Sequence, residues 1–175
     1  MAKGSHFSDR KAAPMHDILV GFAKWLEGTP WGLMTRESVW AYPFVQLIHF
    51  TGLSIWLGTN FALDLRLLGV GSRRATAAQV AQELFAWNWI GFAIVLTGGF
   101  MLFSGIATAF IGNIAFQWKL GLFIPLALIW HVVVQRKARD WGQTSDTPGI
   151  ARFAALTEIL LWVCVITAAV QIPNH

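Results

Sequence analysis

Long stretches without charged residues alternate with short, basic connecting segments along this chain. Residues 39–63 contain no Asp, Glu, Lys or Arg, and neither do residues 84–118. A transmembrane helix needs about 20 consecutive apolar residues, so the second stretch is too long for a single helix. Gly112 and Asn113 supply a turn that divides it. The pattern therefore predicts four membrane-spanning segments, at about 39–65, 84–110, 114–135 and 152–172.

Segments of this kind must be helices, because lipid offers the backbone no hydrogen-bonding partner. Short connections place consecutive helices side by side and antiparallel. We therefore expect an all-α integral membrane protein with four transmembrane helices in an antiparallel bundle. Residues 37–175 would form this membrane domain, and residues 1–36 an N-terminal tail followed by an interfacial helix.

Residues 15–27, MHDILVGFAKWLE, have the pattern of an amphipathic helix. Six apolar side chains share one face: Met15, Ile18, Leu19, Phe22, Trp25 and Leu26. The segment is too short and too polar to cross a bilayer, so we expect it to lie in the membrane interface. The sequence GTPWG at 28–32 predicts a turn after this helix.

The first spanning segment carries its polar groups on one face. On an ideal helix, at about 100° per residue, these side chains fall within roughly 80° of one another. They are Gln46, His49, Trp56, Asn60 and Asp64. Hydrogen-bonding groups are costly in hydrocarbon, so we expect this face to meet a partner, a cofactor or a water-filled site. The opposite face carries small residues, which predict a close contact with another helix: Ser54, Gly58 and Ala62.

The second spanning segment repeats a glycine every seven residues, at Gly91, Gly98 and Gly105. This spacing predicts a stripe of close helix contact, and it would also make room for a planar cofactor. Three tryptophans lie deep in the predicted spans, at Trp56, Trp130 and Trp162. They would either fill the core or flank a flat macrocycle.

Composition agrees with the membrane interpretation and removes several classes of function. The chain is 55% hydrophobic and 13% charged, whereas a soluble domain averages about 25% charged residues. A single cysteine, Cys164, excludes an internal disulfide and a zinc or iron–sulfur cluster held by one chain. The net charge of +4 comes from loops and the N-terminal tail, so we expect no nucleic-acid partner.

The distribution of Lys and Arg predicts the orientation in the membrane. The connection between the first two spans contains Arg66, Arg73 and Arg74, and the connection between the last two contains Arg136, Lys137, Arg139 and Arg152. The positive-inside rule places both loops in the cytoplasm and both termini on the extracytoplasmic side. The basic N-terminal tail opposes this orientation but is outweighed by the two loops. We expect the bacterial inner membrane.

Two histidines, His49 and His131, lie inside the predicted spans, and both are candidate metal ligands. Imidazole is a usual axial ligand of haem b; the alternative for each histidine is a hydrogen-bonded helix contact. At 1.5 Å per residue, His49 would lie about 10 Å and His131 about 25 Å below the outer surface. A haem bound by His49 alone, or completed by a second group, therefore fits better than a haem between the two histidines.

These depths predict two polar layers. The outer layer contains Gln46, His49 and Lys119, and the inner layer contains Asp64, Arg66, Asn88, His131 and Glu158. The Lys119 ammonium would either reach the nearby interface or pair with a haem propionate or a quinone oxygen. In the inner layer, Asp64, His131 and Glu158 would form either a proton relay or a hydrogen-bonded clamp between helices.

Two motifs resemble a known family. The first is His49-x2-Gly52-x3-Trp56-x-Gly58 followed by Leu65-Arg66-Leu67, and the second is Trp118-Lys119-Leu120 with Trp130-His131 near the end of the same helix. They are similar to two helices of the HemJ-type protoporphyrinogen oxidases, and copper-resistance-D-type membrane domains share related patterns. HemJ-type proteins are haem-associated four-helix membrane proteins, so the resemblance implies haem near His49 and Lys119. The segment 64–69 and the N-terminal helix depart from that family.

We therefore expect a small b-type haem-binding membrane protein in electron transfer, with His49, Lys119, Trp56, Asn60 and Gln46 around the cofactor. Its surroundings would be membrane lipid, and its partner a quinone, a redox protein or a larger membrane complex. One alternative is a cofactor-free accessory or scaffold subunit of such a complex. Another is a metal-handling protein of the copper-resistance-D kind, which would lack the Met and Cys clusters that copper(I) prefers. The sequence leaves open whether the protein is an enzyme.

Overall fold

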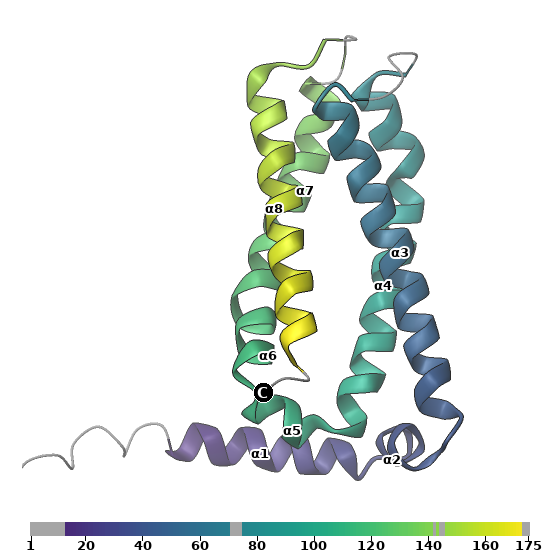
Figure 1. The fold of residues 1–175 in the computed structure, drawn as a ribbon, viewed down its shortest axis with the longest axis vertical. Coiled ribbons are helices and arrows are strands. Elements are labelled where there is room, and N and C mark those ends of the chain that lie inside the picture. Colours follow the sequence, from purple (N-terminus) through teal and green to yellow (C-terminus); the bar gives the residue numbers. More distant parts are fainter. Residues whose placement is uncertain (1–12, 71–74, 142, 144–145, 173–175) are drawn as a thin grey trace, which may run out of the picture.

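The computed structural model describes residues 13–70, 75–141, 143 and 146–172, and every regular element in these ranges is a helix (Figure 1). The elements are α1 (Ala13–Glu27), α2 (Pro30–Glu37), α3 (Ala41–Leu67), α4 (Ala77–Gly105), α5 (Ala107–Gly112), α6 (Ile114–Trp118), the π-helix η1 (Lys119–Phe123), α7 (Ile124–Trp141) and α8 (Gly149–Gln171).

Within these ranges, three helical stretches are long and apolar enough to cross a membrane. They are α4, the continuous rod Ile114–Trp141 made of α6, η1 and α7, and α8. The helix α3 is 27 residues long but does not reach the same hydropathy, because the predicted polar face interrupts it. The all-helical fold and its apolar helices are thus confirmed, and the protein is a membrane protein by these criteria.

The long helices form two pairs, α3 with α4 and α7 with α8 (Figure 1). The end of α3 and the starts of α4 and α8 lie at one end of the bundle, next to the end of α7. There the Thr147 hydroxyl donates to the carbonyl oxygen of Leu67 at 2.7 Å. The helices α1, α2 and α5 lie at the opposite end. Short connections and antiparallel neighbours follow the expected arrangement.

Helices α3 and α4 meet backbone to backbone through glycine. A Cβ atom added to Gly91 would lie 2.7 Å from the backbone nitrogen of Trp56, and one added to Gly98 would lie 2.9 Å from the His49 Cα atom. Only glycine permits this approach. On α3, Gly52 meets Val95 in the same way. The predicted glycine stripe of α4 is therefore confirmed.

The predicted contact through the small residues of α3 is wrong. Ser54, Gly58 and Ala62 are exposed, and a Cβ atom on Gly58 would meet nothing within 4 Å. The reason is that α4 already packs on the Gly52 side, where the glycines of both helices meet. In a membrane, lipid tails can cover a face of small residues as well as another helix can, so these residues do not require a helix partner.

The predicted turn at 28–32 is shorter than expected, because Pro30 begins the helix α2. The Thr29 side chain accepts a hydrogen bond from the Gly32 amide at 3.3 Å and caps that helix. A capping Thr followed by Pro is a helix-start signal as well as a turn signal. The preceding helix, α1, covers the predicted amphipathic segment. Of its predicted apolar face, Leu26 is buried, and four others are exposed: Ile18, Leu19, Phe22 and Trp25.

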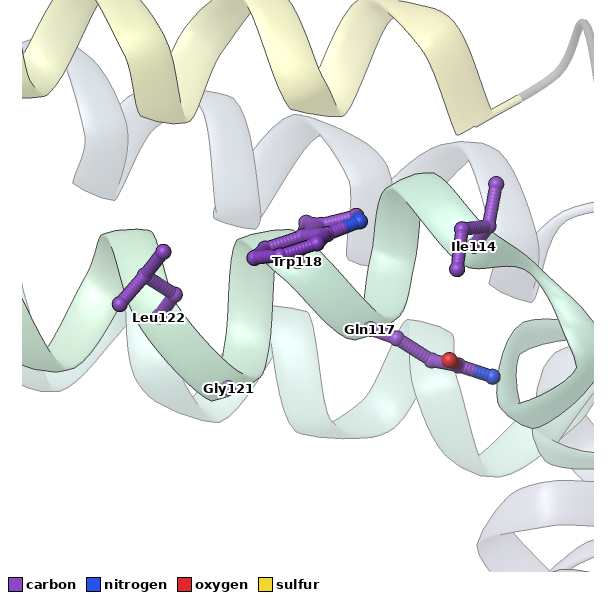
Figure 2. A pocket seen from close by; sticks show the side chains of 5 residues that line it. All are labelled: Ile114, Gln117, Trp118, Gly121 and Leu122. Atoms are coloured by element: carbon purple, nitrogen blue, oxygen red, sulfur yellow. The ribbon is translucent and has the colours of Figure 1, made fainter.

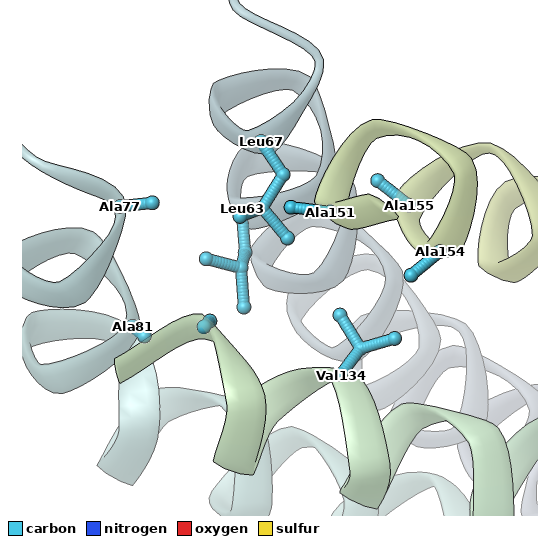
Figure 3. Close-up of a cluster of buried hydrophobic side chains, with 9 residues drawn as sticks. Leu63, Leu67, Ala77, Ala81, Val134, Ala151, Ala154 and Ala155 are labelled. Atoms are coloured by element: carbon cyan, nitrogen blue, oxygen red, sulfur yellow. The ribbon is translucent and has the colours of Figure 1, made fainter. Parts of the chain in front are cut away.

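A cluster of nine buried apolar residues lies at the end of the bundle that holds the α3–α4 and α7–α8 connections. Figure 3 shows this cluster, to which α3, α4, α7 and α8 all contribute: Leu63, Leu67, Ala77, Ala81, Val134, Ala138, Ala151, Ala154 and Ala155. Alanine predominates because small side chains let helices approach closely. Next comes a cluster built on Trp56, Ala127, Trp162 and Val165. Farther along, α6 and η1 contain no buried residue among those described.

Candidate functional site

His131 lies at the centre of a buried hydrogen-bond network. Its Nδ1 atom lies 2.5 Å from Glu158 Oε1, and its Nε2 atom lies 3.0 Å from Asn88 Oδ1. The histidine and the glutamate are each 1% exposed. The three residues come from α7, α8 and α4, so one imidazole ties these helices together.

Asn88 extends the network to α3. Its Nδ2 atom donates to the Thr59 hydroxyl at 2.8 Å and to the side-chain oxygen of Asn60. Gln135, one turn after His131 on α7, donates to Asn88 Oδ1 at 3.4 Å. Each of the long helices therefore contributes at least one polar side chain to a single buried network.

The hydrogen-bond pattern determines where the protons of this network lie. The indole N–H of Trp89 can only donate, so the atom of Gln135 that it meets at 3.1 Å is the amide oxygen. The amide nitrogen of Gln135 therefore points at Asn88, whose Oδ1 must accept. The same oxygen faces His131 Nε2, which must then donate. One further proton is shared in the hydrogen bond between His131 Nδ1 and Glu158 Oε1.

Asp64 lies beside this network but is not hydrogen-bonded to it. The side chain is 1% exposed, and neither carboxyl oxygen has a hydrogen-bond partner among the described residues. Its charge and that of Glu158 act on one another. The sequence grouped Asp64, His131 and Glu158 together; the structure pairs two of them directly and leaves the third buried without a direct partner.

The outer predicted site is built around His49 on α3. The Nδ1 atom of His49 lies 2.9 Å from the backbone carbonyl oxygen of Val95, one turn before Gly98 on α4. A carbonyl can only accept, so Nδ1 carries the hydrogen and Nε2 carries a lone pair. The ring packs closely against Gly99 of α4, since a Cβ atom on that glycine would lie 3.0 Å from the His49 Cε1 atom. The imidazole is half-buried.

Lys119 is the charged residue of the predicted outer layer. It is half-buried, and its charge acts on the His49 ring. Lys119 also begins the π-helix η1, and single π-turns within α-helices occur frequently at functional sites. Gln46, which lies about one turn before His49 on α3, is half-buried as well. These three residues are the predicted outer layer.

Trp56 and Asn60, which the sequence assigned to the same cofactor, belong to the inner layer. The Trp56 ring lies 4.8 Å from the His131 ring, measured between centroids, and 5.7 Å from the Trp162 ring. Asn60 joins the network through Asn88. Trp56 is seven residues beyond His49, which is about 10 Å along the helix. The predicted cofactor set is thus divided between two levels.

Two further observations limit what these sites can hold. Both nitrogens of His131 are engaged by protein side chains, which leaves no lone pair for a metal. No group of three His, Cys, Asp or Glu side chains among the described residues is placed to hold a metal ion. His49 is accordingly the one predicted metal ligand whose Nε2 has a lone pair for iron, and the described structure sets it apart from His131.

A shallow groove is lined by residues that are close to Lys119 in the sequence, but none of them is charged. Figure 2 shows its lining on α6 and η1, where Gly121 leaves a gap between the side chains of Trp118 and Leu122. These residues are exposed, and neither His49 nor Lys119 lines the groove. The groove is an apolar surface feature, and we do not assign it to the cofactor.

Several network residues were absent from the predicted site. Asn88 was placed in the inner layer without a role, Trp89 was expected only as an interfacial residue, and Thr59 and Gln135 were not singled out. One signal was available, since Gln135 follows His131 by four residues and shares its helix face. Thr59 and Trp89 carry no such signal, because their partners come from other helices.

Comparisons with known proteins bear on the family and not on the chemistry. No curated protein and no solved structure matches this chain. Residues 22–173 match the family described as "Family of unknown function (DUF6644)". The match spans well over half of the chain, from α1 to the end of α8, and this protein therefore belongs to the DUF6644 family.

Proposed function

We propose that this protein is a four-helix membrane protein that binds haem b through His49 and takes part in electron transfer. In this proposal α3 is the fourth spanning helix, held against α4 by glycine contacts. The observation that carries the proposal is the hydrogen bond from His49 Nδ1 to the Val95 carbonyl. Such a bond to the second nitrogen orients metal-binding histidines and leaves Nε2 for the iron.

The surrounding residues fit a haem. Gly98 and Gly99 let His49 approach α4 closely, and Lys119 supplies a positive charge for a propionate group. When bound, haem supplies one-electron chemistry at iron, and the protein tunes it through the axial ligand and local polarity. The chain's own contribution is to fix the tautomer of His49 and to hold a cation at the same level. Lys119 would equally suit a quinone oxygen, which supports quinol as the electron donor.

The orientation is part of the proposal. Five basic residues lie on the helix turns next to the α3–α4 and α7–α8 connections, and these helix ends lie at one end of the bundle: Arg66, Arg136, Lys137, Arg139 and Arg152. We propose that this end faces the cytoplasm and both termini the opposite side of a bacterial inner membrane. A C-terminal alkaline phosphatase fusion should then be active and a C-terminal green fluorescent protein fusion dark. The reverse pattern would contradict this orientation.

A cofactor-free scaffold subunit of a larger complex is the second candidate. The buried network and the alanine-rich cluster favour it, because both hold helices together without needing a ligand. A copper-resistance-D-like metal-handling role has less support, since the described residues offer no three-ligand group.

An absorption spectrum separates the candidates. Protein purified from haem-replete cells should show a Soret band and sharp α and β bands after reduction. The variant His49→Ala should lose them and regain them when imidazole is added, because imidazole can occupy the vacated ligand position. His16→Ala, which removes an exposed histidine on α1, is the matched control and should keep full haem. Full haem in His49→Ala would remove His49 as ligand, and a colourless wild-type protein would favour the scaffold.

A further inference from the structure

Five buried polar atoms around the inner network have no hydrogen-bond partner among the described residues. Three are acceptors, namely both carboxyl oxygens of Asp64 and the Oε2 atom of Glu158. Two are donors, the Nδ2 group of Asn60 and the indole N–H of Trp162. Buried polar groups are nearly always paired, so such a group calls for an explanation.

These residues belong to one neighbourhood. Asn60 and Asp64 are one turn apart on α3, and Glu158 and Trp162 are one turn apart on α8. The carboxyl groups of Asp64 and Glu158 act on each other electrostatically. The Trp162 ring packs on Trp56, which precedes Asn60 by one turn on α3. Figure 3 shows that α3 and α8 stay close beyond this point, with Leu63 and Leu67 near Ala151.

Among the described residues, no cation is hydrogen-bonded to Asp64. The His131 ring is already engaged by Glu158, its hydrogen-bond partner. On α3 itself, Arg66 is engaged toward the start of α4, where its Nε atom donates to the Ala75 carbonyl at 2.6 Å. On α4, Glu83 lies at this level but is exposed, and the buried polar side chain of that helix is Asn88. An isolated carboxylate in a membrane interior is expensive, so Asp64 would take up a proton.

The mixture of unpaired atoms indicates water rather than a metal ion. A cation would suit the carboxyl oxygens but would be repelled by the N–H groups of Asn60 and Trp162. A water molecule accepts from such donors and donates to such acceptors, and buried waters typically make about three hydrogen bonds to groups of this kind.

We propose that Asp64 and Glu158 form a proton-binding site inside the membrane, completed by internal water, in which the proton is carried by Asp64. Binding forms an O–H bond on an Asp64 oxygen and breaks one in a hydronium ion, which leaves water behind. Asp64 lies three residues before the end of α3, which is about 5 Å of helix. The proton therefore exchanges with the side of the membrane that holds the basic connections. This site is independent of the haem proposed at His49.

Infrared spectroscopy of the purified full chain in lipid tests the proposal. At neutral pH the wild-type protein should show the C=O band of a protonated carboxyl group, which shifts in D₂O. The band should shift again when only aspartate is ¹³C-labelled, a measurement that needs no variant. It should be absent in Asp64→Asn and retained in Glu83→Gln, which removes an exposed acid of α4. In H₂¹⁸O, an internal-water band should shift, and Asp64→Asn should alter it.

Each negative result counts against the proposal. A wild-type spectrum without a protonated carboxyl band overturns it, as does a band insensitive to aspartate labelling. If no water band responds to both the isotope and Asp64→Asn, internal water is not part of the site. The same spectra recorded on His49→Ala separate this proposal from the haem proposal, because loss of haem leaves the carboxyl band unchanged.

Discussion

The two halves of the bundle use the same polar face of α3 in different ways. Toward the end of α3, Asn60 is absorbed into a network to which all the long helices contribute, and alanines bring those helices close. Toward its start, His49 makes one hydrogen bond to α4 and keeps a nitrogen unengaged by it. In the other helix pair, the elements α6 and η1 at this end have no buried residue among those described. Figure 1 shows the two helix pairs diverging toward this end.

This contrast indicates that the two halves of the bundle have different roles, one in stability and one in ligand binding. Groups that satisfy one another stabilise the fold, while a group oriented by a single bond remains available to a ligand. Changes in the inner half should therefore act on stability, and changes in the outer half on cofactor binding. The following experiments test that separation in order of expected effect.

His131→Ala should have the largest effect on stability. It removes the imidazole and leaves Glu158 buried without its partner, and an unsatisfied buried polar group costs about 1–3 kcal/mol, or more where it is charged. Unfolding in mixed micelles, followed by circular dichroism, measures the loss. The matched outer variant, His49→Ala, removes one hydrogen bond and should cost about 1 kcal/mol. Equal losses in the two variants would contradict these separate roles.

Gly98→Val should act on both halves, because it separates α3 from α4. The added Cβ atom would lie 2.9 Å from the His49 Cα atom, where no flexible side chain can move aside. Overpacking of this kind costs about 1–3 kcal/mol, and displacement of His49 should also lower haem content. Gly58→Ala is the control, since nothing lies within 4 Å of its Cβ position. Normal stability and haem content in Gly98→Val would show that the close approach of α3 to α4 at Gly98 is not a constraint on either half.

Glu158→Gln sharpens the distinction between a clamp and a proton relay. Glutamine keeps the shape and one acceptor but loses the charge, and charge-assisted hydrogen bonds are about twice as strong as neutral ones. A clamp predicts a loss of about 1 kcal/mol with unchanged haem content and electron-transfer rate. If the rate falls between pH 6 and pH 8 while the fold is intact, the inner network takes part in the proton chemistry.

Lys119→Met should have the smallest effect on stability and a measurable effect on haem. The half-buried ammonium would lose its pairing with a propionate, worth about 1 kcal/mol or roughly a fivefold change in haem affinity. Lys119→Arg keeps the charge and should keep the affinity. Haem titration of the apoprotein measures both. Equal affinity in the Met and Arg variants would remove Lys119 from the site.

The helices and their polar faces followed from local patterns. Charge-free stretches of suitable length predicted the long helices, although α4 begins at Ala77 rather than after Glu83, and α7 continues to Trp141. The period of the helix was enough to place Asn60 and Asp64 on one face, and both are buried. The depth argument separated His49 from His131 for the same reason, since rise per residue is a local quantity.

The choice of partners was settled only by the tertiary structure. On sequence alone, Asn88 had several polar groups at its depth, and which of them it bonds depends on how four helices rotate and cross. The small-residue face of α3 and the glycine face of α4 were equally good candidates for contact, but only the glycine stripe meets a neighbouring helix. Asp64 shows the same limit: its helix position predicted burial, yet only packing from the other helices decided that His131, and not Asp64, would pair with Glu158. Local periodicity fixes the face on which a side chain lies, whereas hydrogen-bond pairing needs the position of every neighbouring helix.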